Sequence, residues 1–461
     1  MQTITFYSYK GGLGRTLAVA NVARYLSLFG KNVFAVDFDL EAPGLHYKLH
    51  LGGGEWRIER GLVDYIHAFV LGKEPEGLQG YVIEVDRKSP PEGSIHILPA
   101  GAVPSSEYWQ KLARINWHDL FYSENAKGIP FFLELKAQIA EEFAPDYLLI
   151  DARTGITEVG GIATTLLADV VVCLLLNNRE NLEGAREVLR GIRRAARLPR
   201  QAKVEIVPVV ARLPELKDRQ QEERILEEVR TFLNEEAPDL ESTLSVEDVF
   251  LLHVDPELQL QESLRIGGAQ GPEESVLLRD YLRLFARLIP SLFTEWDPVL
   301  VRERLKTAKE VCHLAVAGFT FLRKCAPELI EAVQRGCLLR CVLANPEDFG
   351  TPREAAFLHG EQIVAWRELQ EIASHVRRGG SVQLRVKESV IDPIMTIIDP
   401  KDEEGTMLVT LSGFKQSLSA RPSLMSHRTS NSESFEFFHH SFERIWENAR
   451  PVDLASGKIG D

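Results

Sequence analysis

The feature that most constrains the fold is a glycine-rich segment, Lys10 to Thr16, with the sequence KGGLGRT. It follows the apolar stretch Ile4 to Tyr7 and precedes the amphipathic stretch Leu17 to Leu28, after which Gly30 provides a helix stop. Glycines at three of four successive positions let backbone N–H groups converge on an anion, and the start of the next helix adds its positive dipole. We therefore expect a strand, a phosphate-binding turn and a helix, with a nucleoside triphosphate as the natural ligand.

This segment, the phosphate loop, departs from the usual pattern G-x-x-x-x-G-K-[ST] at two places. Tyr9 stands where the first glycine is usual, and Arg15 stands where the lysine is usual. Lys10 adds a cation before the glycines, and Thr16 keeps the hydroxyl that can bind Mg²⁺. The alternative is a plain glycine-rich turn. The loop residues that we expect to contact the nucleotide are Gly11, Gly12, Leu13, Gly14, Arg15, Thr16 and Leu17.

Two further strand ends supply carboxylates. The apolar strand Val33 to Val36 leads into Asp37 and Asp39, which the two-residue period of a strand places on one face. The strand Tyr147 to Ile150 ends at Asp151. Ligands of open α/β sheets bind at the carboxyl ends of strands, so we expect these carboxylates to hold Mg²⁺ and to orient a water molecule. Taken singly, an acidic residue at a strand end can also be only a helix cap or turn former.

Together, the three segments resemble a known family. Lys10 to Thr16, Asp37 to Gly44 and Asp151 to Gly155 are similar to the deviant Walker A, A′ and Walker B segments of the ParA/MinD class (SIMIBI) of P-loop ATPases. The KGGVGR-motif-variant subfamily, in which Arg replaces the last Walker lysine, is the closer match. Its stretches DLEAPGL and DxRTGI are present at Asp39 to Leu45 and Asp151 to Ile156. The resemblance covers roughly residues 1 to 290.

The resemblance implies an ATP-sandwich homodimer, in which Lys10 of one subunit reaches the phosphates bound by the other. It implies that Thr16 binds Mg²⁺, that Asp151 holds the metal through its hydration shell, and that Asp39 orients the attacking water. Asp37, the other carboxylate at the same strand end, is then expected in the metal site. The catalytic residues implied in this way are Lys10, Arg15 and Asp39.

Two parts of the nucleotide site match the family less well. Arg15 presents a planar fork where most of the superfamily has the point charge of lysine, so we expect ATP binding with slow hydrolysis. Asn178 and Arg212 follow strand ends whose loops hold the base in the superfamily, but Ala211 stands where the family has an asparagine. Adenine is therefore assigned by analogy.

The rest of the chain continues as an α/β protein. Apolar strands are predicted at Asp169 to Leu176, Val204 to Val210 and Val249 to Val254, with helices between them, which is the pattern of a doubly wound, mostly parallel sheet. A fresh strand and helix pattern begins after Thr294 to Pro298. We therefore expect a P-loop domain at residues 1–295 and a second, smaller α/β domain at residues 300–452.

The second domain weakly resembles the phospholipase-D-like fold, in the segments Gly318 to Leu322, Ala344 to Pro346 and Phe442 to Glu447. Members of that fold that cleave phosphodiesters carry H-x-K, because the histidine is the nucleophile and the lysine holds phosphate. None of the histidines after residue 300 has this spacing. We expect a non-catalytic binding or signalling module, with phosphate contact by His427 and Arg428 as the alternative.

A predicted helix, Glu183 to Leu198, carries a basic stripe. At 100° per residue its arginines fall on one continuous face. ParA-type dimers hold DNA nonspecifically through basic surfaces, so nucleic acid is a candidate partner. The formal net charge of −14 opposes general polyanion binding, and a solvated helix face is the alternative. The arginines of this basic stripe are Arg186, Arg190, Arg193, Arg194 and Arg197.

Length and composition favour a globular, cytoplasmic protein. With 461 residues, the chain exceeds the size of a single core, so more than one domain is expected. No run of eighteen apolar residues or amphipathic C-terminal anchor is present, which disfavours a membrane association. The cysteines are odd in number and lack metal-site spacing, so we expect reduced core thiols. They are Cys173, Cys312, Cys325, Cys337 and Cys341.

Three functions remain open from the sequence. The first is an ATP-dependent switch whose nucleotide-driven dimerisation controls the second domain, for example in prokaryotic stress or phage defence. A protein partner is also expected, but the sequence does not name it. The second is a phosphodiesterase or nuclease effector gated by the ATPase. The third is a DNA-associated partition or positioning ATPase. The missing H-x-K signature favours the first.

Overall fold

The computed structural model describes residues 1–49, 58–73, 77–85, 93–195, 203–216, 219–237, 239, 242–256, 258, 264, 276–289, 294–295, 298–316, 318–344, 352–377, 379–387, 394–410, 422–429, 432–456 and 458–459. The chain forms two compact units. The first contains residues 1–269 and 275–281, and the remainder belongs to the second. The division lies within helix α11 (Val276–Leu288), so the end of the segment that the sequence assigned to the first domain groups with the second unit.

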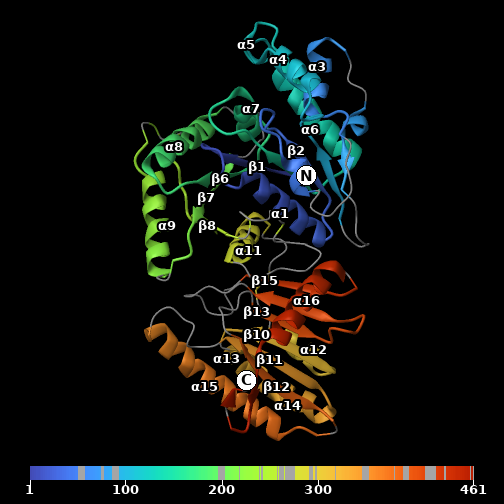
Figure 1. The fold of residues 1–461 in the computed structure, drawn as a ribbon, viewed down its shortest axis with the longest axis vertical. Coiled ribbons are helices and arrows are strands. Elements are labelled where there is room, and N and C mark those ends of the chain that lie inside the picture. Colours follow the sequence, from blue (N-terminus) through green and yellow to red (C-terminus); the bar gives the residue numbers. More distant parts are fainter. Residues whose placement is uncertain are drawn as a thin grey trace. The chain divides into compact units, whose positions relative to one another are not determined.

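The first unit is built on a mostly parallel sheet (Figure 1). Among the described residues, eight strands lie in the order β3-β4-β2-β5-β1-β6-β7-β8, and only β3 runs antiparallel to its neighbour. This confirms the doubly wound α/β fold expected from the sequence. The strands are β1 (Gln2–Ser8), β2 (Val33–Asp37), β3 (Ile83–Glu84), β4 (Ile95–Leu98), β5 (Tyr147–Asp151), β6 (Val170–Leu175), β7 (Glu205–Leu213) and β8 (Phe250–His253).

Helices cover this sheet because its strands are apolar on both faces. Every residue of β6 is buried, for example, as in the continuous apolar strands of parallel sheets. Helix α1 begins directly after the phosphate loop and packs against β1, β2 and β5. The other helices described here are α2 (Leu45–Leu49), α3 (Leu62–Val70), α4 (Ser106–Arg114), α5 (Trp117–Tyr122), α6 (Gly128–Phe143), α7 (Glu158–Gly161), α8 (Arg179–Arg194) and α9 (Arg219–Leu233), with α1 at Arg15–Leu28.

Strand register brings the three sequence segments together. Asp37, the last residue of β2, is the register partner of Asp151, the last residue of β5. Asp151 is also the partner of Phe6 on β1, two residues before the strand ends at Ser8. The carboxyl ends of β1, β2 and β5 are therefore adjacent, and the phosphate loop leaves the sheet beside both carboxylates.

A group of helices between β2 and β5 supports this edge of the sheet. Helices α3, α4, α5 and α6 lie together in Figure 1. Phe132 of α6 lies with its ring centroid 5.7 Å from that of Phe38, the residue between the two aspartates of the β2 end. Tyr108 of α4 is buried, and its hydroxyl donates to the carbonyl of Leu40 at 2.6 Å. These contacts fix the segment that carries Asp39.

The second unit has a mixed sheet. Among the described residues, nine strands lie in the order β17-β16-β12-β11-β10-β13-β14-β15-β9, with β10, β11 and β12 parallel to one another and the neighbours of this trio antiparallel. The strands are β9 (Thr294–Glu295), β10 (Glu310–Ala315), β11 (Leu338–Ala344), β12 (Ser381–Lys387), β13 (Ile394–Ile398), β14 (Thr406–Thr410), β15 (Pro422–His427), β16 (Arg450–Asp453) and β17 (Lys458–Ile459). The helices are α12 (Pro298–Leu305), α13 (Phe319–Lys324), α14 (Ala326–Arg335), α15 (Pro352–Ser374) and α16 (Ser432–Asn448). The phospholipase-D-like assignment stays a prediction.

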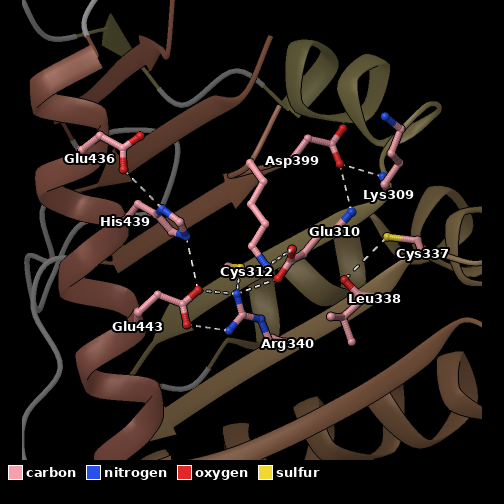
Figure 2. Close-up of polar contacts among 11 residues, drawn as sticks. Lys309, Glu310, Cys312, Cys337, Leu338, Arg340, Asp399, Glu436, His439 and Glu443 are labelled. Carbon is pink, nitrogen blue, oxygen red and sulfur yellow. Dashed lines mark hydrogen bonds and ion pairs between the residues drawn. The ribbon is translucent and has the colours of Figure 1, made fainter. Parts of the chain in front are cut away.

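A buried ion cluster joins α16 to the sheet of the second unit (Figure 2). The guanidinium of Arg340 on β11 donates to both carboxylate oxygens of Glu443 at 2.6 and 2.8 Å and lies 2.6 Å from Glu310. It also lies 5.2 Å from the ring centroid of Trp446. Hydrogen bonds from Arg340 and His439 lower the pKa of Glu443 to about 2. Because Arg340 already meets two carboxylates, the cluster fixes the position of α16.

The histidine considered for phosphate contact has neighbours within the protein. His427 lies on β15, where its Nδ1 is 3.1 Å from the hydroxyl of Thr406. Arg428 forms a 2.5 Å ion pair with Glu436 of α16. Both side chains thus make contacts that stabilise the sheet and α16, and phosphate contact by them stays a prediction.

The cysteines and hydropathy agree with a packed interior. All five cysteines are free and buried, as expected from the sequence. In the part of the chain that the structure describes, no helix combines the length and the apolar character needed to cross a membrane.

Candidate functional site

Arg15 lies between the two carboxylates that the sequence assigned to catalysis and metal binding. Its Nε donates to Asp151 Oδ1 at 2.5 Å, and its Nη2 donates to Asp39 Oδ2 at 2.6 Å. The Arg15 and Asp151 side chains are 6% and 0% exposed, and that of Asp39 is 13% exposed. The pKa of Arg15 stays above its usual value because the two carboxylates outweigh the opposing effect of burial. The planar guanidinium reaches both partners at once, which a lysine ammonium does with less directional control.

Asp37 is fully buried and holds the turn that follows β2. Its Oδ2 accepts hydrogen bonds from the backbone N–H groups of Gly44 and Leu45, each at 3.0 Å, and its Oδ1 accepts one from Asp39 at 3.2 Å. Burial, and then the charge of Asp151, raise the pKa of Asp37 to about 8. Asp37 therefore shapes the segment around Asp39.

Asp151 combines full burial with an oxygen that has spare bonding capacity. Burial raises its pKa, even though Arg15 and the hydroxyl of Thr16 favour the charged form. Its Oδ2 is buried and accepts no hydrogen bond of good geometry from the described residues. An oxygen of this kind suits a metal-bound water, and Thr16 supplies a hydroxyl beside it. The residues present therefore fit a hydrated Mg²⁺ ion.

The metal would need oxygen ligands from a nucleotide as well. Among the described residues, no group of three or more His, Cys, Asp and Glu side chains is arranged to hold a metal ion alone. Mg²⁺ is commonly bound by one or two carboxylates together with substrate phosphates. The arrangement thus agrees with a metal that arrives with its nucleotide.

The phosphate loop has the backbone geometry of an anion cradle. Gly12 and Gly14 have φ values of +77° and +82°, which favour glycine, and Gly14 is the N-cap of α1. A Cβ built at Gly11 or Gly14 would meet no described atom within 4 Å, whereas Leu13 is buried. The loop is therefore anchored by its apolar side chain, while the glycine backbone faces open space in which phosphate can approach.

Arg212 contacts this loop from the end of β7. Its Nη1 donates to the carbonyl of Gly12 at 3.1 Å, and its backbone has a positive φ of 60°. The register between β7 and β8 shifts between Ala211 and Leu213, so Arg212 lies at an irregularity of the strand. This places the Arg212 guanidinium beside the phosphate loop. Its assignment to the base stays a prediction.

Lys10 pairs with a residue that the sequence did not single out. Its Nζ lies 2.6 Å from Glu180 Oε1, on the first turn of α8, and both side chains are largely exposed. The hydrogen bond and charge of Glu180 raise the pKa of Lys10. The neighbouring Tyr9 packs on the same helix at Gly184, where any Cβ would overlap the tyrosine ring. The first residue of the phosphate loop and the residue before it therefore both contact α8.

Asn178 caps α8. Its side-chain oxygen accepts a hydrogen bond from the backbone N–H of Asn181 at 2.9 Å, and Asn181 in turn accepts from Leu176 at the end of β6. The geometry gives Asn178 a local role in starting the helix that carries Glu180. Its contact with a base stays a prediction.

The basic stripe is not the continuous exposed surface that the sequence predicted. Arg190 is buried, with Nη2 donating to the carbonyls of Glu235 and Glu236 at 3.0 Å each. Arg186 donates to the carbonyl of Phe232 and lies 4.0 Å over its ring. Helix α9 ends at Leu233, so Arg186 binds a carbonyl of its last turn and Arg190 binds carbonyls of the segment that directly follows it.

The remaining arginines of the stripe are more accessible. Burial lowers the pKa of Arg193, and Arg194 forms a 3.2 Å ion pair with Asp239. Arg197 lies outside the described residues. The prediction of a continuous five-residue nucleic-acid surface was therefore wrong for Arg186 and Arg190, because periodicity alone does not reveal that α9 packs against this face.

Two contacts near the site were missed by sequence reasoning. Arg153 and Glu41 form a bidentate ion pair that joins the DxRTG segment to the DLEAPG segment. Both residues belong to the motifs quoted above, so their pairing had a signal but no assigned role. Tyr108, which binds the carbonyl of Leu40, had no such signal because it lies in a helix far along the chain.

The chain resembles solved structures at low identity, and three of them serve as examples. A chain of the MinC:MinD cell division protein complex from Aquifex aeolicus is 19% identical, with a TM-score of 0.39, over 62% of this chain and 96% of that one. The septum site-determining protein MinD complexed with Mg-ADP from Pyrococcus horikoshii is 18% identical, with a TM-score of 0.40 and the same coverages. The pNOB8 ParA bound to nonspecific DNA is 18% identical, with a TM-score of 0.36, over 62% and 92%. Curated protein sequences give no match.

A family profile covers the segment that forms the site. The profile described as the CobQ/CobB/MinD/ParA nucleotide binding domain matches residues 4–230. This range includes the phosphate loop, Asp37, Asp39, Asp151 and Arg212. Residues 4–230 therefore form a nucleotide-binding domain of the CobQ/CobB/MinD/ParA family.

Proposed function

We propose that the protein is an ATP-dependent molecular switch that dimerises around ATP and Mg²⁺, hydrolyses ATP slowly and thereby controls its second unit. The observation that carries the proposal is the Arg15 bridge. A single cation of the phosphate loop holds Asp39 and Asp151, which come from two other strand ends. Arg15 thereby brings the phosphate loop into contact with Asp39, proposed to orient water, and with Asp151, proposed to hold the metal.

In this proposal the chain's own groups bind and orient the triphosphate. Backbone N–H groups between Gly11 and Thr16 bind the phosphates, together with the dipole of α1. Thr16 and Asp151 hold the metal and its water shell, and Asp37 keeps the neighbouring turn in place. Bound Mg²⁺ would neutralise charge on the β- and γ-phosphates.

Arg15 exchanges partners in this scheme. Its guanidinium can bind phosphate only by giving up some of its contact with Asp39 and Asp151, which frees Asp39 to orient water. The buried carboxylates compete with phosphate for the same cation, so part of the binding free energy is used to separate the ion pairs. This competition supports slow turnover.

Substitution of Lys10 tests the proposed dimerisation. Light scattering of the full chain should show a doubling of mass with ATP and Mg²⁺, and Lys10→Ala should remain monomeric. Phosphate release measured in the same samples should be slow in the wild type and lost in Asp39→Asn. An unchanged mass of the wild type under all nucleotide conditions would contradict the switch.

A further inference from the structure

The contact between Lys10 and α8 is set by two matched pairs of residues. Tyr9 and Lys10 are adjacent in the chain, and Gly184 and Glu180 are one helical turn apart on the same face of α8. Tyr9 packs on Gly184, and Lys10 forms its 2.6 Å ion pair with Glu180. The packing of Tyr9 on Gly184 fixes the distance between the phosphate loop and α8. Glu180 therefore lies within reach of Lys10.

Glu180 is also well placed to carry a negative charge. It lies in the first turn of α8, where the helix dipole favours an anion, and Asn178 caps the same turn. The other first-turn ion pair, Arg179 with Glu183 at 2.7 Å, joins two exposed side chains of the same helix and leaves the loop untouched. Glu180 is thus distinguished from Glu183 by its contact with the phosphate loop.

Carboxylates therefore meet both cations that bracket the glycines. Lys10 meets Glu180, and Arg15 meets Asp39 and Asp151. A triphosphate offers the same kind of anionic oxygen to the same cations. Each cation that binds phosphate must first leave its carboxylate.

We propose that Glu180 is a positioning residue that competes with phosphate for Lys10 and so sets the ATP concentration at which the chain dimerises. This inference rests on the dimeric switch proposed above. Lys10 can reach a nucleotide across the dimer only after its ion pair with Glu180 opens. Glu180 therefore opposes assembly until the triphosphate replaces its carboxylate.

The expected effect is modest because the pair is exposed. Exposed ion pairs are weak and are screened by salt. We expect Glu180→Gln to lower the concentration of a non-hydrolysable ATP analogue needed for half-maximal dimerisation by about two- to five-fold. The gain should shrink as salt concentration rises.

The test is sedimentation of the full chain with Mg²⁺ and AMP-PNP, comparing wild type, Glu180→Gln and the matched control Glu183→Gln. The control should behave as the wild type, and thermal unfolding should be alike in all three. A fourth chain, Lys10→Ala with Glu180→Gln, should show no gain over Lys10→Ala alone in nucleotide affinity.

The outcomes separate the two proposals. If the wild type dimerises and Glu180→Gln needs as much analogue, the role of Glu180 is overturned while the switch stands. A gain that persists in the Lys10→Ala background also overturns it, because Glu180 would then act through general charge. If the wild type stays monomeric at saturating analogue, the dimeric switch itself fails, and the role of Glu180 fails with it.

Discussion

Arg15 Nε and Asp151 Oδ1 are 2.5 Å apart in a place where the two side chains are almost fully buried. The pair crosses from the start of α1 to the end of β5, so it joins elements more than a hundred residues apart in sequence. Arg15 therefore compensates the buried charge of Asp151.

Removing the Arg15 charge should destabilise the first unit. Arg15→Met leaves Asp151 buried without its cation, and breaking a buried pair in this way costs about 3–5 kcal/mol. Protonation of Asp151 would lessen this loss. Urea denaturation gives the free energy of unfolding of Arg15→Met, of Asp151→Asn and of the double variant. The loss in the double variant should be much smaller than the sum of the losses in the two single variants. Additive losses would mean that the two groups do not interact.

The site's packing against α8 can be tested with two glycines of one helix. Gly184→Ala should displace the ring of Tyr9 and weaken ATP binding, because the added methyl group overlaps that ring. Gly191→Ala meets no described atom within 4 Å and should stabilise α8 by about 1 kcal/mol without changing ATP affinity. Titration with a fluorescent ATP analogue and thermal unfolding measure both effects. Equal nucleotide affinity in the two variants would show that the packing of Tyr9 on Gly184 does not position the phosphate loop.

His253 should make stability fall at alkaline pH. Its ring is buried between Asp280 at 2.7 Å and Glu222 at 3.1 Å. Burial lowers its pKa, but the hydrogen bonds that its ring nitrogens donate to these carboxylates outweigh that effect and raise the pKa to about 9. The unfolded value is about 6.5, so the stabilisation is complete below about pH 6.5 and is lost as pH rises through 9.

The free energy of unfolding of the wild type and of His253→Gln, measured from pH 6 to pH 10, isolates this group. The difference between them should shrink across the window from about 6.5 to 9. A difference that stays constant with pH would mean that His253 is neutral in the folded protein.

Arginines of the basic stripe should separate into structural and exposed members. Arg190→Ala removes donors to the carbonyls of Glu235 and Glu236, just after α9, and should cost about 1–3 kcal/mol of stability. Arg194→Ala, whose ion pair is half exposed, should change stability little. Urea denaturation measures both, and equal losses would contradict the burial of Arg190. DNA retention in gel shifts is best tested with Arg194→Glu, since Arg190→Glu would also perturb folding.

Acid should release α16 in the second unit. The pKa of Glu443 is lowered to about 2, mainly by Arg340, so its stabilisation is present above the unfolded value near 4.5 and is lost as pH falls through 2. Glu443→Gln should mimic this loss at neutral pH and increase hydrogen exchange of α16 amides. Glu447→Gln, an exposed residue one turn away, is the matched control. Unchanged exchange in Glu443→Gln would show that the bidentate pair does not hold the helix.

The sequence alone was sufficient to predict those strands, helices and turns that a short stretch of residues specifies. The glycines after β1, the apolar runs of β2 and β5 and the acidic residues that end them predicted the parallel sheet and its ligand edge. Period and composition report such elements directly, because a buried parallel strand is apolar throughout and a phosphate-binding turn needs glycine.

Only the tertiary structure decided which charges meet. Arg15 with Asp39 and Asp151, Lys10 with Glu180, and the two stripe arginines with the end of α9 are contacts between residues far apart in the chain, and a pairing of this kind leaves no periodic trace. The sequence determined that a phosphate loop and three strand-end aspartates exist. Strand register and helix packing determined that carboxylates compete for its cations, because the distance between side chains, and the water excluded around them, are set by the fold and not by spacing along the chain.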